Sequence, residues 1–89
     1  MYKLVCLLNL FTEAQNIYLI DTDSGKSNIA ATVTMDELSE RIVDICDITK
    51  VNHVELCGAP TFSAAMVDDI RMYARTKYNN NDIIVEVAQ

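Results

Sequence analysis

Glycine, proline and tryptophan are scarce in this sequence, which has two glycines, one proline and no tryptophan among 89 residues. Disordered and low-complexity chains are poor in hydrophobic residues, whereas 51% of these residues are hydrophobic, so that class is excluded. No apolar run approaches the roughly 20 residues that a membrane-spanning helix needs. The N-terminal residues also lack the small-residue cleavage site of a signal peptide. We therefore expect a cytoplasmic protein that makes no contact with a membrane.

Closely spaced metal ligands are also missing. The three cysteines, Cys6, Cys46 and Cys57, are far apart, and His53 is the only histidine. A structural zinc site needs about four nitrogen or sulfur ligands close together, so we predict no metal site and no cofactor. We expect the cysteines to be reduced and to pack as small apolar residues. His53 has no nucleophile or acid near it in the sequence, which predicts no catalytic triad and no enzyme.

Basic residues are few: seven lysines and arginines stand against thirteen aspartates and glutamates, for a formal charge of −6. A negative surface repels the phosphate backbone, so we expect no direct binding to nucleic acid. One interpretation of the acidity is a surface that engages a basic partner. The other is a solvated surface that keeps the chain soluble, and it is favoured because the sequence has no long acidic block.

Apolar runs rich in β-formers predict five strands. The predicted strands span residues 2–10, 17–21, 28–34, 51–57 and 83–87. The first run is almost unbroken, which favours a central strand that is buried on both faces. Turn-forming residues in 11–16 and 21–27 separate the first three strands.

Two segments have the spacing of amphipathic helices. The first begins near Met35, where Thr34 or Asp36 can cap it. Its apolar face consists of Met35, Leu38, Ile42, Ile45 and Cys46. The second follows the turn 58–61, with Pro60 in its first turn or Thr61 as its cap, and ends at the asparagines after Tyr78. Its predicted inward residues are Phe62, Ala65, Met66, Ile70, Tyr73 and Ala74.

The order of these elements predicts a single α/β domain over residues 1–89. The order β-β-β-α-β-α-β gives a three-strand antiparallel meander followed by two right-handed crossovers. If the last two strands pair beside the first, the five-stranded mixed sheet has the order 3-2-1-4-5. Both crossovers advance in one direction across the sheet, which predicts that the two helices lie on one face.

This order of elements is similar to the core of the ribonuclease-H-like superfamily, which includes the actin-like ATPase subdomains, and two short segments support the resemblance. Leu8-Asn9-Leu10-Phe11 precedes a second strand at comparable spacing, and residues 54–60 resemble the family's strand, glycine loop and helix. The resemblance implies carboxylates that hold two metal ions, or a glycine that cradles phosphate. Here Asn9 replaces the first aspartate, Glu55 is the only acid of the fourth strand, and Phe11 replaces the glycine. The resemblance therefore predicts the fold without either chemistry.

Two turns invite a ligand-binding interpretation. Gly25-Lys26-Ser27 resembles a phosphate loop, but Ile20 stands where that motif needs its first glycine, and a strand follows instead of a helix. The turn from Gly58 to Ser63 joins a strand to a helix N-terminus, where α/β sheets commonly bind ligands. Asn9, Gly58, Thr61 and Ser63 are the candidate contacts for a nucleotide or an anion.

Two helices on one face leave the other face of the sheet uncovered. Apolar side chains are predicted on that face at Val5, Leu7, Tyr18, Ile20 and Ile84. A patch of this kind usually marks an interface, and the last strand is an unprotected edge that can pair with another chain. In the alternative, Tyr2, Phe11 and the loops cover part of the face.

The leading functional hypothesis is a non-enzymatic binding or regulatory protein that associates with a protein partner or forms a homodimer. Its small size and acidity resemble those of accessory proteins of phages and mobile elements, which often inhibit a host factor by occupying it. The alternative is a small-ligand binder or residual enzyme that uses the turn after the fourth strand.

Overall fold

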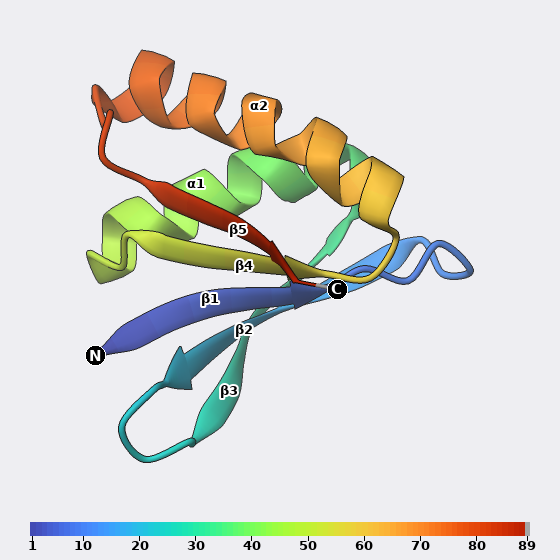
Figure 1. Ribbon diagram of the computed structural model, residues 1–89, viewed down its shortest axis with the longest axis horizontal. Coiled ribbons are helices and arrows are strands. Elements are labelled where there is room, and N and C mark those ends of the chain that lie inside the picture. The colour runs from blue at the N-terminus through green and yellow to red at the C-terminus, as the bar shows by residue number, and fades with distance from the viewer. Residues whose placement is uncertain (89) are drawn as a thin grey trace.

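The computed structural model describes residues 1–88 and confirms the predicted α/β fold, a five-stranded mixed sheet with two helices (Figure 1). The sheet has the order β3-β2-β1-β4-β5. Its strands are β1 (Tyr2–Leu7), β2 (Ala14–Asp21), β3 (Ser27–Thr34), β4 (His53–Cys57) and β5 (Ile84–Ala88). The helices are the 3-10 helix η1 (Met35–Glu37), α1 (Leu38–Thr49) and α2 (Pro60–Tyr78). Within residues 1–88, no helix combines the length and apolarity needed to cross a membrane.

The central strand is β1, which pairs antiparallel with β2 and parallel with β4. It is shorter than predicted: after the Leu8 N–H donates to the Cys57 carbonyl at 2.8 Å, the chain turns into a hairpin loop, residues 8–13. The second strand begins at Ala14 rather than Ile17, because Ala14 pairs with Thr34 of β3. Pairing with β3 therefore overrides the turn propensity of the segment 14–16.

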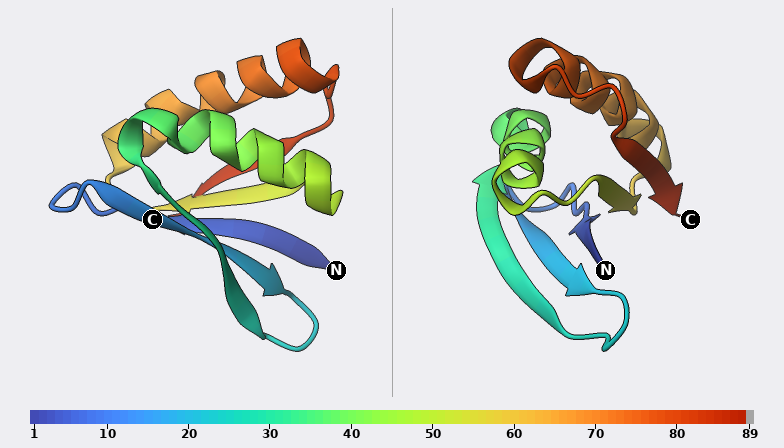
Figure 2. Two further views of the ribbon diagram at one scale, coloured as in Figure 1. Left: turned by 180° about the vertical axis from the view of Figure 1, so that it is seen from behind. Right: turned by 90° about the vertical axis from the view of Figure 1, so that its left-hand side faces the viewer.

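Both helices cover the same face of the sheet, as the two views in Figure 2 show, and they pack against each other. The core lies between this helical layer and the sheet. Its largest fully buried apolar side chains are Leu4, Ile17, Leu38, Ile42, Leu56 and Ile70. On the outer surface, Lys77 Nζ of α2 lies 3.0 Å from Glu40 Oε2 and 2.8 Å from Asp44 Oδ1 of α1. These ion pairs connect the two helices.

Thr34 takes the N-cap position of a helix that begins at Met35, as one of the two predictions had it, but without the expected side-chain bond. Neither Thr34 nor Asp36 makes a side-chain capping bond, and the α-helix proper begins at Leu38, after one turn of 3-10 helix. The backbone of Met35 is satisfied elsewhere, since its N–H donates to the Glu13 carbonyl of the hairpin loop at 3.2 Å. A contact distant in the sequence thus takes the place of a local cap.

The second helix begins with Pro60 at its first position, as one of the two predictions had it, and Thr61 is not the cap. The cap is Ala59, whose φ of 43° lies in the left-handed region. Asn79 ends the helix in the left-handed conformation, as predicted. Phe62 and Ala65 were predicted to point inward but are exposed, because the buried side of the first turns of α2 is formed by Ser63 and Met66 instead.

Candidate functional site: the uncovered face of the sheet

The pairing register determines which side chains share the face that no helix covers. At its centre, Val5 of β1 lies opposite Tyr18 of β2 and Glu55 of β4. The surface called the open face consists of Lys3, Val5, Leu7, Tyr18, Ile20, Ile29, His53, Glu55, Cys57, Ile84 and Glu86. The structure thus brings together the five residues predicted for an interface, and their role as an interface stays a prediction.

Exposure of the apolar side chains varies strongly across the open face. Leu7 is 55% exposed and Ile84 is 54% exposed, whereas Val5 is only 7% exposed. Tyr18 and Ile20 are half-buried. The alternative in which Phe11 covers this face is wrong, because the Phe11 side chain is 99% exposed at the end of the hairpin loop. The centre of the face is therefore shielded by its own neighbours, and its rim presents apolar surface to water.

Polar pairs lie between the apolar residues of the open face. Lys3 of β1 donates to Glu55 of β4, with the nitrogen 3.0 Å from Oε2. His53 Nε2 lies 2.8 Å from Glu86 Oε1 on β5. Sequence reasoning missed both pairs, since they join strands that are far apart in the chain. The only signal was the alternation that places Glu55 and Cys57 on one side of β4.

The pair of Lys3 with Glu55 also affects the charge state of two groups on the open face. The hydrogen bond from Lys3 holds the pKa of the Glu55 carboxyl below its usual range, so Glu55 is ionised at neutral pH. Burial raises the pKa of the Cys57 thiol, and the neighbouring Glu55 raises it further. Cys57 therefore carries its proton and donates to Glu55 Oε1 at 3.4 Å. A protonated thiol is a weak nucleophile, so the group acts here as a hydrogen-bond donor.

The arrangement offers apolar contacts and paired hydrogen-bonding groups. In the part of the chain that the structure describes, no three His, Cys, Asp or Glu side chains are close enough together to hold a metal ion. Lys3 and Glu55 are each about one quarter exposed, and their charges offset each other.

The turn predicted to bind a ligand has a structural role in the fold. Gly58 has a φ of 81°, and a Cβ built on it would lie 2.9 Å from the Leu8 carbonyl oxygen. The turn therefore needs glycine both for its backbone conformation and for its contact with the end of β1. The Ser63 side chain is fully buried, and its hydroxyl donates to the Gly58 carbonyl at 2.6 Å. This leaves Ser63 without an exposed atom for a ligand.

The two remaining candidate ligand residues do not share a pocket. The Asn9 side chain accepts a hydrogen bond from the Phe11 N–H, and Asn9 lines a depression beside Leu7 and Tyr18. Thr61 is exposed and lines a different groove, beside Leu10. Binding of a nucleotide or anion at this end of the sheet stays a prediction.

No protein-family model and no curated protein matches this chain. A solved structure from Bacteroides thetaiotaomicron, described as a protein with an actin-like ATPase fold and unknown function, is similar to it with a TM-score of 0.64 and 11% sequence identity. The similarity covers 98% of this chain and 32% of that chain, so this chain spans about a third of that protein's length. It shows that the fold of this chain is similar to an actin-like ATPase fold, and it shows nothing beyond the fold.

Proposed function

We propose that this protein acts by binding another polypeptide through the open face, and that a second copy of the chain is one such partner. The observation that carries the proposal is the one-sided helical layer, which leaves Leu7, Ile29 and Ile84 more than half exposed on the other side of the sheet. Burying such side chains in a contact is favourable by about 25 cal/mol per Å² of apolar surface.

The distribution of charge supports this use of the face. The open face carries Lys3, His53, Glu55 and Glu86, and each acid lies against a basic group. Most of the acidic residues that give the chain its charge of −6 lie elsewhere. Two copies can therefore bring their open faces together without forcing the excess negative charges into one interface.

The coverage of the structural relative also supports the proposal. In that protein, the region with this fold is about a third of the chain, and the other two thirds are further protein. A single copy of this sheet has no covering layer over its open face within residues 1–88. A partner or a second copy would supply that layer.

Sedimentation equilibrium tests the homodimer directly. We expect the wild-type chain to associate reversibly and Leu7→Lys to be monomeric at the same concentrations, because a charge at the exposed rim would be desolvated in the contact. Ile48→Lys is the matched control, since Ile48 is 78% exposed on α1, away from the open face. Equal association of wild-type and Leu7→Lys proteins would contradict the homodimer.

A heterologous partner is tested by affinity capture from the source cells. Wild-type protein on a support should retain a protein that Leu7→Lys does not retain and Ile48→Lys does. Such a partner would fit an accessory protein that inhibits a host factor by occupying it. If the wild-type chain is monomeric and no capture depends on Leu7, the open face is not a binding surface.

A further inference from the structure

A second apolar surface lies at the end of the molecule where α2 begins. The hairpin loop between β1 and β2 projects beyond the neighbouring strands at this end (Figure 1). Leu10 is 59% exposed there, and Phe11 is exposed almost completely. Beside the loop lies a shallow groove of about 430 Å³, lined mostly by apolar atoms. The surface called the hairpin patch consists of the groove residues Leu10, Ala59, Pro60, Thr61, Phe62 and Ala65, together with Phe11, which follows Leu10 in the loop and does not line the groove.

The loop that carries Leu10 and Phe11 is held in one shape by a buried side chain. Gln15 is 1% exposed, and its Oε1 accepts from the Asn9 N–H at 2.9 Å. Its Nε2 donates to the carbonyls of Asn9, at 2.7 Å, and Thr12, at 2.9 Å. The Asn9 side chain accepts from the Phe11 N–H at 2.9 Å. A loop fixed in this way presents its apolar side chains at little further cost in conformational entropy, which favours binding.

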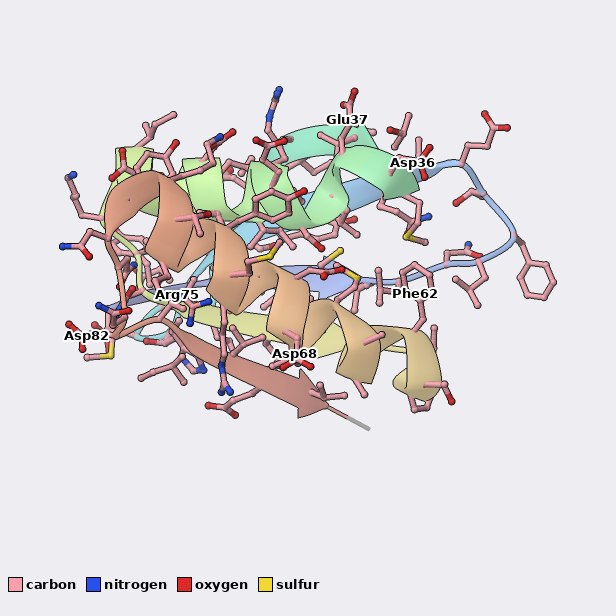
Figure 3. The ribbon with its side chains drawn as sticks, turned by 90° about the horizontal axis from the view of Figure 1, so that it is seen from above. Asp36, Glu37, Phe62, Asp68, Arg75 and Asp82 are labelled. Carbon is pink, nitrogen blue, oxygen red and sulfur yellow. The ribbon has the colours of Figure 1, made fainter. Side chains whose placement is uncertain are left out.

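No charged residue lines the groove of the hairpin patch, and the charged residues of the hairpin loop and of η1 are all acidic. Glu13 lies next to the loop, and its carbonyl accepts from Met35 of η1, which brings Asp36 and Glu37 to the same end. Figure 3 places Asp36 and Phe62 toward this end, and Arg75 and Asp82 at the opposite one. None of the seven basic residues lies in the hairpin loop, in η1 or in residues 58–66.

From the apolar groove, the fixed loop and the one-sided charge, we infer that the hairpin patch binds an amphipathic segment of a partner protein whose apolar side chains are flanked by lysine or arginine. Leu10 and Phe11 contact the apolar side chains, and Glu13, Asp36 and Glu37 attract the basic flanks. A second copy of this chain does not fit, since its own acids would meet these. This surface is independent of the open face.

The test uses a fluorescein-labelled synthetic amphipathic helix with leucines on one side and lysines on the other, followed by fluorescence anisotropy. We expect saturable binding to the wild-type protein. We expect no binding of two control peptides, one with glutamates in place of the lysines and one with serines in place of the leucines. Binding should weaken with added salt, because the charges are exposed. Absence of saturable binding, or equal binding of either control peptide, would overturn the inference.

Matched variants separate this surface from general attraction between an acidic protein and a basic peptide. Phe11→Asn should weaken binding by about tenfold, as truncation of an anchor residue does, whereas Ile48→Asn should not. The double variant Glu13→Gln/Glu37→Gln should also weaken peptide binding. The double variant Asp47→Asn/Asp82→Asn, which removes the same charge at the other end of the molecule, should weaken it less. The inference would be contradicted if Phe11→Asn and Ile48→Asn weakened binding equally, or if the two double variants did.

A lipid membrane is the alternative binding partner for an exposed phenylalanine such as Phe11. Phosphatidylcholine vesicles should sediment without the wild-type protein. If they instead carry down the wild-type protein and not Phe11→Asn, the hairpin patch binds lipid, and the inference of a basic protein segment is wrong. The open-face variant Leu7→Lys should bind the peptide as the wild type does, which keeps this test separate from that of the open face.

Discussion

The two faces of β1 differ in what shields them. Leu4, Cys6 and Leu8 face the helical layer, and each is buried. On the other face Val5 is also buried, although no helix covers it, because Tyr18 and Glu55 stand beside it on the neighbouring strands. Leu7, two residues further along, lacks this protection and is mostly exposed.

Apolar residues on both faces of a strand therefore do not by themselves indicate that both faces are covered by another layer of the protein. Both faces of β1 are apolar in sequence, yet one is buried in a core and the other is shielded only at its centre. Long neighbouring side chains can bury a valine across a sheet. Ile29 and Ile84 at the rim, which are on edge strands and have such a neighbour on one side only, are therefore the positions that distinguish a covered face from an open one.

The largest expected effect comes from the covered face. Leu56→Ala should lower the free energy of unfolding by about 2–5 kcal/mol, because it leaves a cavity under the helices at a fully buried position. Urea denaturation followed by circular dichroism measures the change. A loss below about 1 kcal/mol would mean that the covered face is no better packed than the open one.

A smaller effect is expected from the polar residue at the rim of the covered face. Gln15→Ala should cost about 1–3 kcal/mol, because backbone groups of the hairpin loop lose their buried partner. Hydrogen exchange should accelerate at the Asn9 amide in particular. Thr12→Ala is a suitable control, since the Thr12 hydroxyl is exposed and the Gln15 bonds do not involve it. Unchanged exchange at Asn9 would show that Gln15 does not hold the loop.

The ion pair of the open face should contribute less, and with a defined pH dependence. Lys3→Met should cost about 0.5–1 kcal/mol near pH 7, since the pair is only partly buried. Lys3 lowers the folded-state pKa of Glu55, so the contribution is present above the unfolded pKa, about 4.3, and is lost as the pH falls through the folded pKa. Stabilities of wild type and variant measured from pH 7 downward should converge. A difference independent of pH would contradict this assignment.

The smallest effect is expected at the rim of the open face. Leu7→Ala should change the unfolding free energy of the monomer by no more than about 0.5 kcal/mol, because the side chain is already largely in water. Thermal or urea unfolding at low protein concentration, where association is absent, measures this value. A loss as large as that of Leu56→Ala would remove the distinction between the two faces.

Much of the fold follows from local pattern. Strand order, helix placement and the inward positions of α1 followed from apolar spacing and the right-handed rule for crossovers. The start of β2 could not be predicted, because Ala14, Gln15 and Asn16 follow turn-forming residues and become a strand only by pairing with β3. The helical start near Met35 was predicted, but the bond from its N–H to the distant Glu13 carbonyl was not, because it joins η1 to the hairpin loop.

The open face was predictable in Val5, Leu7, Tyr18, Ile20 and Ile84, but not in Ile29, which pairs with Tyr18 beside a register shift, nor in its polar residues. Alternation along each strand places Val5 and Leu7 on one face without knowledge of their neighbours. The pairs of Lys3 with Glu55 and of His53 with Glu86 depend on the parallel registers of β1, β4 and β5, which no local pattern encodes. The role of Gln15 was missed because its bonds form only when the loop folds back onto it.

The central position of β1 also has a consequence for the order of folding. Leu4 pairs with the nearby Leu19 on one side and with the distant Val54 on the other. Closing a long loop costs more entropy than closing a hairpin, so we expect the antiparallel meander to form early and the parallel half of the sheet to dock late. Until β4 arrives, one edge of β1 is unpaired, and the nascent meander is the stage at which this chain is most exposed to misassembly.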